Sequence, residues 1–432
     1  MIRRPKLLFL SQALPYPPDG GVKIRTYHVL RLLAREFDVT ALCFHRLRHG
    51  WSPDAVPTAV EALGAFARVE AFPIPQEHSR LRLLWDHFRS GVGGRVYTNY
   101  VYDSSRFRAR LLRWLEAVRF DLVHADSLDL SGYFPLLEAR GLPVVCVHHD
   151  AQSKLLGRRA GHERGWRRAY VRHQSRLMAR EERFWCPRVA LNVAVSDLDR
   201  EVLASIAPGG RFTVIPNGVD VEAFRPEPGR DEGLVFVGGT SWFPNRDAIH
   251  YFCREILPHI RREQPTAPVW CVGRSTPEER RGFAAEYGVT LTGYVPDVRP
   301  YVRDAGCFVV PIRVGGGTRI KILDAWAMGK AVVSTSIGCE GLAAVDGENI
   351  LVRDTPEAFA RAVVDVLTRP ALRHRLGEAG RATVERRYSW DAIGRKMHSI
   401  YRGVAESHAA PQDRGSTRRV SQRPRGRADV SP

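Results

Sequence analysis

Short apolar runs recur along most of this chain, and stretches long enough for amphipathic helices separate them. The runs lie at residues 7–10, 39–44, 122–124, 144–147, 189–195, 212–215, 234–237, 269–272, 290–292, 307–310 and 331–334. Short apolar strands that alternate with helices are typical of parallel sheets covered by helices on both faces. The pattern therefore predicts an α/β protein with doubly wound sheets.

The length of the chain indicates more than one core. At 432 residues the chain suits two domains of about 200 residues each. A Pro-Gly-Gly turn at 208–210, after which the chain re-enters a strand, predicts a boundary near residue 210. Apolar residues become sparse after residue 405, and residues 414–427 contain six arginines and no acid. We expect a disordered basic tail over 405–432.

Targeting and redox signals indicate a cytoplasmic protein. No apolar run approaches the roughly 18 residues of a membrane span, and the basic start leads only into a short strand, so we expect no export. The seven cysteines are scattered and contain no CxxC pair. We interpret them as reduced core residues.

The formal charge of +18 is unevenly distributed. Residues 154–183 carry ten Lys or Arg against three Glu, and a second arginine-rich stretch covers 80–119. Solvated helix faces explain the charge as well as an anionic membrane surface does. We do not expect nucleic acid as a partner, because no zinc-finger, RNP-like or helix-turn-helix signature accompanies the charge.

A glycine triplet followed by cations predicts an anion site. Residues 315–317 are glycines after the apolar run at 307–310, and a helix is expected to begin near Thr318. Free N–H groups and the dipole of that helix would face the loop, and Arg319 and Lys321 add full charges. The segment therefore predicts phosphate binding, although a plain turn with solvated cations would have the same residues.

Residues 315–342 (GGGTRIKILDAWAMGKAVVSTSIGCEGL) resemble the donor-site segment of family 4 (group 1) retaining glycosyltransferases with the GT-B fold. The likeness is greatest to bacterial sugar transferases associated with exopolysaccharide synthesis. Further segments agree in order, namely 15–21 (PYPPDGG), 149–150 (HD), 195–197 (VSD), 216–220 (PNGVD), 236–239 (FVGG), 293–299 (GYVPDVR) and 388–390 (YSW). The resemblance covers residues 5–403.

This resemblance implies two Rossmann-like domains that face a central cleft. The acceptor side would be the domain over 1–210, the nucleotide-sugar side the domain over 211–387, and a helix over 388–404 would cross back. The implied activity is hexosyl transfer, with retention, from a nucleoside-diphosphate sugar to a carbohydrate or lipid-linked acceptor. Nothing resembles the Asp-x-Asp metal site of the other common transferase fold, so we expect neither a metal nor another cofactor.

The resemblance also assigns donor-binding residues in the glycine-rich segment. Family members carry two glutamates eight positions apart, and Asp324 stands at the second position, where it would hold the ribose hydroxyls. Gly316 occupies the first position, so the usual sugar contact is absent or comes from elsewhere. Backbone amides of Gly317 and Thr318 match the stretch that approaches the sugar and phosphates.

Further donor-binding assignments fall on two other loops of the second domain. Gly238 opens the loop after the first strand, and Arg246 lies near the position of a family lysine, whereas Gly239 replaces a family arginine. Tyr294 and Val295 belong to the matching 293–299 segment. We infer that Arg319 and Lys321 take over part of the neutralisation of the leaving diphosphate.

The first domain supplies the remaining candidates. Gly20 and Gly21 form a glycine loop that the family uses to approach the donor phosphate or the acceptor. His149 matches a family histidine close to the reacting sugar, whereas the adjacent His148 would face the other side of its strand. His149, Arg319 and Lys321 are the predicted catalytic residues, and retention of this kind needs no protein nucleophile.

Two other classes of protein stay open at this stage. Nucleotide-sugar epimerases and phosphorylases share the architecture, and a non-catalytic nucleotide-sugar-binding assembly subunit would tolerate the glycines at normally charged positions. The expected location is the cytoplasm, with docking on the anionic inner face of the cytoplasmic membrane through first-domain arginines.

Overall fold

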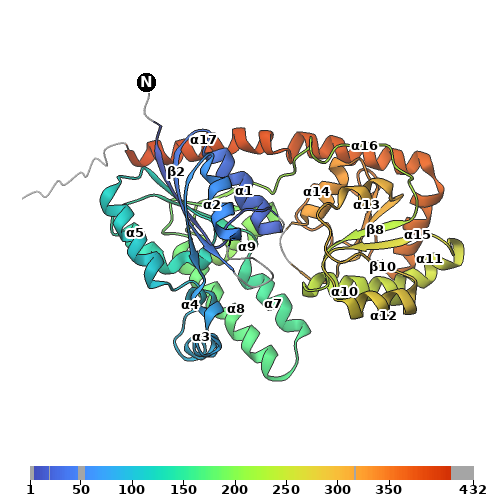
Figure 1. Ribbon diagram of the computed structural model, residues 1–432, viewed down its shortest axis with the longest axis horizontal. Helices are drawn as coiled ribbons and strands as arrows, with labels where there is room; N and C mark the ends of the chain where they lie inside the picture. The colour runs from blue at the N-terminus through green and yellow to red at the C-terminus, as the bar shows by residue number, and fades with distance from the viewer. Residues whose placement is uncertain (1–3, 19, 47–53, 316–317, 410–432) are drawn as a thin grey trace, which may run out of the picture.

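The computed structural model describes residues 4–18, 20–46, 54–315 and 318–409. The chain forms two parallel sheets in two domains that lie side by side (Figure 1). The first sheet has the order β3-β2-β1-β4-β5-β6-β7. Its strands are β1 Lys6–Ser11, β2 Asp38–His45, β3 Arg68–Pro73, β4 Leu122–Ala125, β5 Val144–His148, β6 Leu191–Ala194 and β7 Phe212–Val214.

The second sheet has the order β10-β9-β8-β11-β12-β13. Its strands are β8 Leu234–Val237, β9 Val269–Val272, β10 Thr290–Leu291, β11 Cys307–Val310, β12 Val332–Ser334 and β13 Leu351–Val352. All strand pairs in both sheets are parallel. The order runs outward in both directions from β1 and from β8, which confirms the predicted doubly wound α/β fold.

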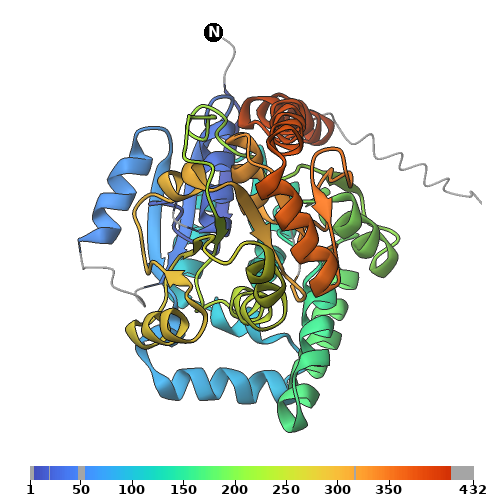
Figure 2. The ribbon, with the colours of Figure 1, turned by 90° about the vertical axis from the view of Figure 1, so that its right-hand side faces the viewer.

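Helices cover both faces of each sheet (Figures 1 and 2). In the first domain they are α1 Gly21–Leu33, α2 Ala55–Gly64, α3 Arg80–Val92, α4 Tyr97–Val101, α5 Ser105–Ala117, α6 Phe134–Glu138, α7 Gln152–His162, α8 Gly165–Trp185 and α9 Asp197–Ile206. Those that follow are α10 Phe243–Tyr251, α11 Leu257–Glu263, α12 Pro277–Tyr287, α13 Arg299–Asp304, α14 Ile320–Ala327, α15 Pro356–Thr368, α16 Pro370–Arg387 and α17 Trp390–Ala409.

The predicted domain boundary at residue 210 needs a correction. Strand β7 (Phe212–Val214) pairs with β6 and completes the first sheet. It covers the edge of β6, which would otherwise leave unpaired backbone groups at that side of the sheet. The chain therefore leaves the first domain only after Val214.

The crossover helix is longer than predicted. Helix α17 runs back along the first domain and buries Trp390, Ile393, Met397 and Tyr401 in its core (Figure 1). The helix reaches Ala409, so residues 405–409, predicted as the start of the tail, are helical. Apolar side chains such as Val404 still pack against the first domain there. The rest of the predicted tail, 410–432, lies outside the described residues.

The cysteines agree with the prediction of reduced core residues. All seven cysteines are buried free thiols. None of the helices in the described ranges combines the length and apolar character that a membrane crossing requires.

Candidate active site

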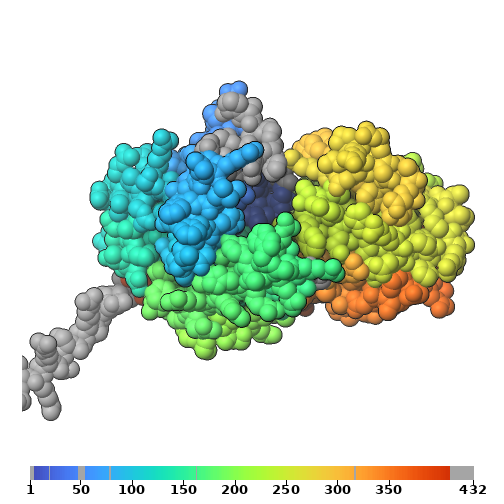
Figure 3. Space-filling view, turned by 90° about the horizontal axis from the view of Figure 1, so that it is seen from below, coloured from blue at the N-terminus to red at the C-terminus, as the bar shows by residue number. Residues whose placement is uncertain are grey.

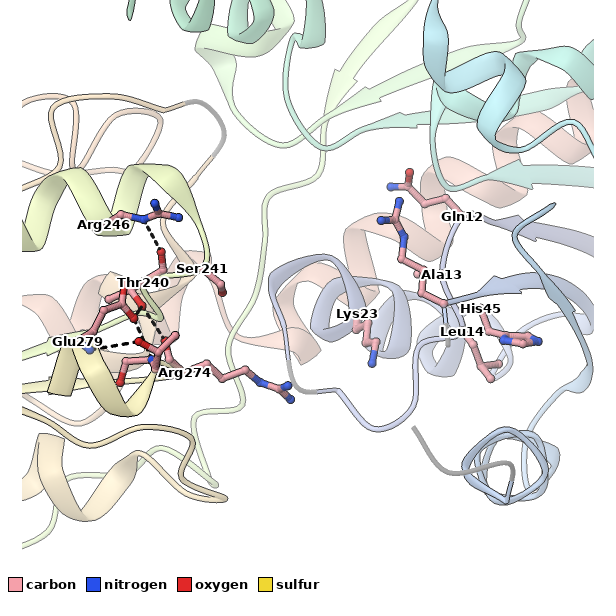
Figure 4. A pocket seen from close by; sticks show the side chains of 13 residues that line it. Gln12, Ala13, Leu14, Lys23, His45, Thr240, Ser241, Arg246, Arg274 and Glu279 are labelled. Carbon is pink, nitrogen blue, oxygen red and sulfur yellow. Dashed lines mark hydrogen bonds between the residues drawn. The ribbon is translucent and has the colours of Figure 1, made fainter. Parts of the chain in front are cut away.

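A cavity of about 770 Å³ lies between the two domains. Figure 3 shows the hollow from below, and Figure 4 shows its lining. The first domain contributes Gln12, Ala13, Leu14, Lys23, His45 and Arg46, and the second contributes Thr240, Ser241, Arg246, Arg274, Ser275, Thr276 and Glu279. Most of these residues follow the carboxyl ends of β1, β2, β8 and β9, where ligands bind in open parallel sheets.

The donor helix α14 begins two residues later than predicted, with Arg319 at its N-cap position. Thr318 precedes it, and its Oγ1 accepts a hydrogen bond of 2.5 Å from Nδ2 of Asn217. Gly316 and Gly317 lie outside the described residues. A Cβ atom at Gly21 would stand 3.7 Å from Cδ1 of Ile320, so the first-domain glycine loop, including the extended Gly20 before α1, approaches the start of α14.

Lys321 lies directly against the loop after β8. Its Nζ donates to Oδ1 of Asn245 at 2.9 Å and lies 4.2 Å from the centroid of the Phe236 ring. A Cβ atom at Gly238 would be 2.8 Å from this Nζ, so a side chain at 238 would displace the ammonium group. Burial lowers the pKa of Lys321 to about 7, and the charge of Arg319 adds to that effect. Burial also lowers the pKa of Arg319.

The glycine that replaces the expected family arginine has a steric cause. A Cβ atom at Gly239 would lie 2.9 Å from the carbonyl oxygen of Arg274, because the loops after β8 and β9 touch. A side chain at 239 is therefore excluded without movement of that backbone. Lys321 of α14 brings a cation to this loop, with Nζ 2.8 Å from a Cβ position at Gly238.

Asp324 follows one turn later on α14 and is half-buried. Burial raises the pKa of Asp324 to about 7, against the opposing effect of Lys321. Among the residues that the structure describes, none donates a hydrogen bond to this carboxylate. Its oxygens are thus available to accept hydrogen bonds from ligand hydroxyls.

The other predicted donor residues of the second domain lie in three different surroundings. Arg246 lines the cavity, with Nε donating to the carbonyl of Thr240 at 3.0 Å. Tyr294 is exposed, and the guanidinium carbon of Arg274 lies 4.8 Å from its ring centroid. Val295 packs against the core of the second domain.

His149 follows β5, and its Nε2 lies 3.7 Å from Oδ1 of Asp126. Asp126 is buried directly after β4 and accepts hydrogen bonds from Thr26 Oγ1 (2.7 Å) and Ser11 Oγ (3.1 Å). Burial would raise the pKa of Asp126, but the imidazoles of His124 and His149 hold it well below its usual range. Asp126 thus lies beside His149, without a hydrogen bond between Oδ1 of Asp126 and Nε2 of His149.

The neighbouring His148 faces the opposite way, as strand alternation predicts. It is buried, its Nε2 lies 3.0 Å from Oδ1 of Asn192, and burial lowers its pKa to about 4. Sequence reasoning missed Asp126. The available signal was an acid directly after the 122–124 run, at the same sheet edge as His149.

Two buried or half-buried arginines of the first domain connect it to the second. Arg25 is buried and donates to Ile215 O (2.9 Å), Pro216 O (2.8 Å) and Asn217 Oδ1 (3.0 Å). Asn217 in turn bonds Thr318, so this connection runs from α1 to the donor loop. The sequence analysis gave no role to Arg25, and it noted Asn217 only as part of the matching segment 216–220.

The second arginine, Arg158 of α7, forms a two-bond ion pair with Glu340 at 2.6 Å for each bond. Its Nη1 also donates to the carbonyl of Gly315 at 3.0 Å. This contact clamps the loop before α14 from the first-domain side. Neither partner was singled out from the sequence.

Comparison with solved structures identifies the class of protein. Sucrose-phosphate synthase from Thermosynechococcus elongatus has a TM-score of 0.67 at 19% identity, over 93% of this chain and 100% of that one. HepE of Anabaena in complex with UDP has a TM-score of 0.65 at 15% identity, over 92% and 100%. With two Rossmann-like sheets around a cleft, this protein has the GT-B fold.

Sequence comparison identifies the family within that class. The family described as "Glycosyltransferase Family 4" matches residues 19–223, and "Glycosyl transferases group 1" matches residues 231–369. The phosphatidyl-myo-inositol mannosyltransferase of Mycobacterium tuberculosis is 28% identical over 354 residues, which is 76% of this chain and 86% of that protein. The protein is a glycosyltransferase of the family 4 type.

Proposed function

We propose that the enzyme transfers a sugar, with retention, from a nucleoside-diphosphate sugar to a carbohydrate or lipid-linked acceptor. The biological setting we propose is the synthesis of exopolysaccharide or another cell-surface glycan. The observation that carries the proposal is the pair Lys321 and Asp324, one turn apart at the start of α14. Neither has an ion-pair partner within 4.0 Å among the described residues, and burial moves both pKa values to about 7.

Such a pair suits the two ends of a nucleoside diphosphate. The ammonium group of Lys321 faces a neutral amide oxygen, so an anionic phosphate would provide the missing countercharge. The carboxylate of Asp324 would accept hydrogen bonds from two ribose hydroxyls. Structures of HepE with UDP and with UDP-glucose support this donor class, and the mannosyltransferase relative supports a lipid acceptor by its name.

The chemistry requires neutralisation of the leaving group. Negative charge develops on the diphosphate oxygen as the sugar becomes oxocarbenium-like, and fixed cations in a dry site stabilise that charge. We assign this role to Lys321 and Arg319, with the backbone of the glycine segment. The acceptor hydroxyl would attack on the face that the diphosphate leaves, next to His149, which lies beside Asp126.

A ligand panel tests the proposal. Uridine, guanosine, adenosine and cytidine diphosphates and their sugars are each added, with and without chelator, and the melting temperature and calorimetric affinity are measured. We expect one nucleoside diphosphate to stabilise the protein, and we expect this to survive chelation, because we propose a metal-independent enzyme. The anomeric configuration of the transferred sugar, read by NMR, tests retention.

Matched variants locate the binding site. Asp324→Asn and Lys321→Ala should reduce the stabilisation, whereas Asp365→Asn on α15 and Lys396→Ala on α17 should leave it unchanged. Stabilisation equal in all four variants would contradict the site. Turnover of the donor without any acceptor would favour an epimerase, and binding with neither transfer nor hydrolysis would favour an assembly subunit.

A further inference from the structure

Helix α3 (Arg80–Val92) presents its apolar side chains to solvent and its polar ones to the protein. Leu81, Leu84, Trp85, Phe88 and Val92 are exposed, with fractions from 54% for Trp85 to 78% for Leu81. Their spacing of three, one, three and four residues places them on one face of the helix. We call these five residues the α3 stripe. Asp86 and Ser90, on the opposite face, are completely buried.

Polar contacts hold α3 firmly in this orientation. The Asp86 carboxylate accepts from Nε of Arg82 at 2.9 and 3.0 Å. Ser90 Oγ accepts from Nε2 of Gln174 on α8 at 2.8 Å and donates to the carbonyl of Arg95 at 3.0 Å.

A third contact adds to these. His87 Nδ1 lies 2.7 Å from the hydroxyl of Tyr170, also on α8. A rotation of α3 that buried the stripe would break the contacts of Ser90 and His87 with α8 and would turn the buried Asp86 toward solvent. Exposure of the stripe is therefore built into the packing of the domain.

Helix α3 lies on the lower edge of the first domain, next to the hairpin of α7 and α8 (Figures 1 and 2). Trp166, 75% exposed, stands at the start of α8. Four exposed arginines follow on α8 at every fourth position, namely Arg168, Arg172, Arg176 and Arg180. Arg180 Nη1 lies 3.9 Å from a Cβ position at Gly94, just beyond the end of α3. Apolar and cationic surfaces thus adjoin.

We propose that α3 is an interfacial helix, which lies in the headgroup region of an anionic bilayer with the α3 stripe inserted. A helix of 13 residues is too short to cross a bilayer, but an amphipathic helix with Trp, Phe and Leu on one face and cations beside it binds in the interface plane. The proposal rests on α3 and α8 and does not depend on the donor site.

Charge favours a lipid surface over a second copy of the chain. A dimer formed through the stripe would bring two rows of α8 arginines toward each other, which costs free energy through like-charge repulsion. Anionic headgroups instead complement those arginines. Because insertion buries apolar side chains, binding should retain a part that salt does not remove, unlike docking by arginines alone.

Vesicle co-sedimentation tests the proposal with vesicles of phosphatidylcholine, alone or mixed with phosphatidylglycerol. The test variant is Leu84→Ser/Phe88→Ser, and the matched control is Phe184→Ser, which removes an exposed Phe from α8 outside the stripe. We expect the full-length protein to bind the mixed vesicles, and the double variant to bind about tenfold more weakly. The control should bind like the unmodified protein.

Two further measurements distinguish a loss of membrane binding from a loss of the fold or of the donor site. The double variant should keep its circular dichroism spectrum and its nucleotide-induced thermal shift, so a failure of the donor site would be seen separately. Trp85→Phe should diminish the blue shift of tryptophan emission on vesicle binding. Unchanged binding of the double variant would overturn the proposal. So would a dimer in solution that the double variant abolishes, if no vesicle binding accompanies it.

Discussion

The two halves of the candidate active site differ in how burial and nearby charges shift the pKa values of their ionisable groups. On the second-domain side, burial moves the pKa values of Lys321 and Asp324 to about 7, because their effect on one another is smaller than the effect of burial. On the first-domain side, contacts with His124 and His149 hold the pKa of the buried Asp126 well below its usual range. The second-domain half therefore keeps two buried ionisable groups without an ion pair, which the proposed donor would complement, whereas Asp126 in the first-domain half already has polar partners.

The substitution with the largest expected effect on stability is Asp126→Asn. Asp126→Asn should lower the free energy of unfolding by about 3–5 kcal/mol, because the buried Arg25 would lose a nearby countercharge and the hydroxyls of Ser11 and Thr26 would lose an anionic acceptor. Urea unfolding at neutral pH measures the change, with Asp365→Asn as the control. A decrease in the free energy of unfolding below about 1 kcal/mol would mean that Asp126 does not hold the first-domain half together in the free enzyme.

The same carboxylate predicts an acid-sensitive fold. A pKa that folding depresses contributes stability above the unfolded value, near 3.9, and that stability disappears as the pH falls toward the folded value. The stability of the unmodified protein should therefore fall steeply below about pH 4. Asp126→Asn should show a shallower loss over the same range.

Substitution of Asp324 should affect ligand binding and leave the stability of the free enzyme unchanged, which is the opposite of what we expect for Asp126. Asp324→Asn should weaken nucleoside diphosphate binding by about 1–3 kcal/mol, the cost of a lost charge-assisted hydrogen bond. It should not lower the stability of the free enzyme at pH 8, where the unmodified carboxylate is ionised in a site that disfavours its charge. Calorimetry and thermal unfolding give the two quantities. Destabilisation of the free enzyme similar to that of Asp126→Asn would abolish the contrast between the halves.

Lys321 makes donor binding dependent on pH. With a pKa of about 7 in the free enzyme, it loses its proton as the pH rises, and a bound diphosphate favours its return. Affinity should fall above pH 7, by up to about tenfold per pH unit, with proton uptake on binding. Calorimetry in two buffers of different ionisation enthalpy measures that uptake. Lys321→Arg should flatten the profile, and an identical slope in that variant would assign the titration to another group.

The smallest expected effect concerns the clamp between the halves. A double-mutant cycle of Arg158→Ala and Glu340→Gln should give a coupling energy of about 1 kcal/mol or less, since the pair is partly exposed. If the clamp positions the donor loop through Gly315, Arg158→Ala should weaken nucleotide binding more than Glu340→Gln does. Equal effects on binding would restrict the clamp to a role in stability.

The sequence predicted the fold well, for physical reasons, and the donor segment stays a prediction. Buried parallel strands such as β8 and β11 are uniform apolar runs, and a glycine loop with Arg319 and Lys321 lies within a few neighbouring residues. Local patterns of this kind need no knowledge of distant contacts. The exact start of α14 and the end of α17 depended on packing, and both were off by a few residues.

Residues that act across long sequence separations were not predictable in this way. Asp126 meets Thr26 across a hundred positions, and Arg158 meets Glu340 across 182. No local pattern encodes such pairs. The α3 stripe was missed for a different reason, because its periodicity is that of any amphipathic helix and only the structure shows which face is buried.

Helix α17 has a consequence for the order in which a newly made chain acquires its structure. The core of the second domain is drawn from Val219 to Tyr388, a continuous portion of the chain. The first domain lacks Trp390, Met397 and Tyr401, and the hydroxyl of Tyr401 near His124, until the last helix has left the ribosome. The half that is synthesised first is therefore the half that is finished last.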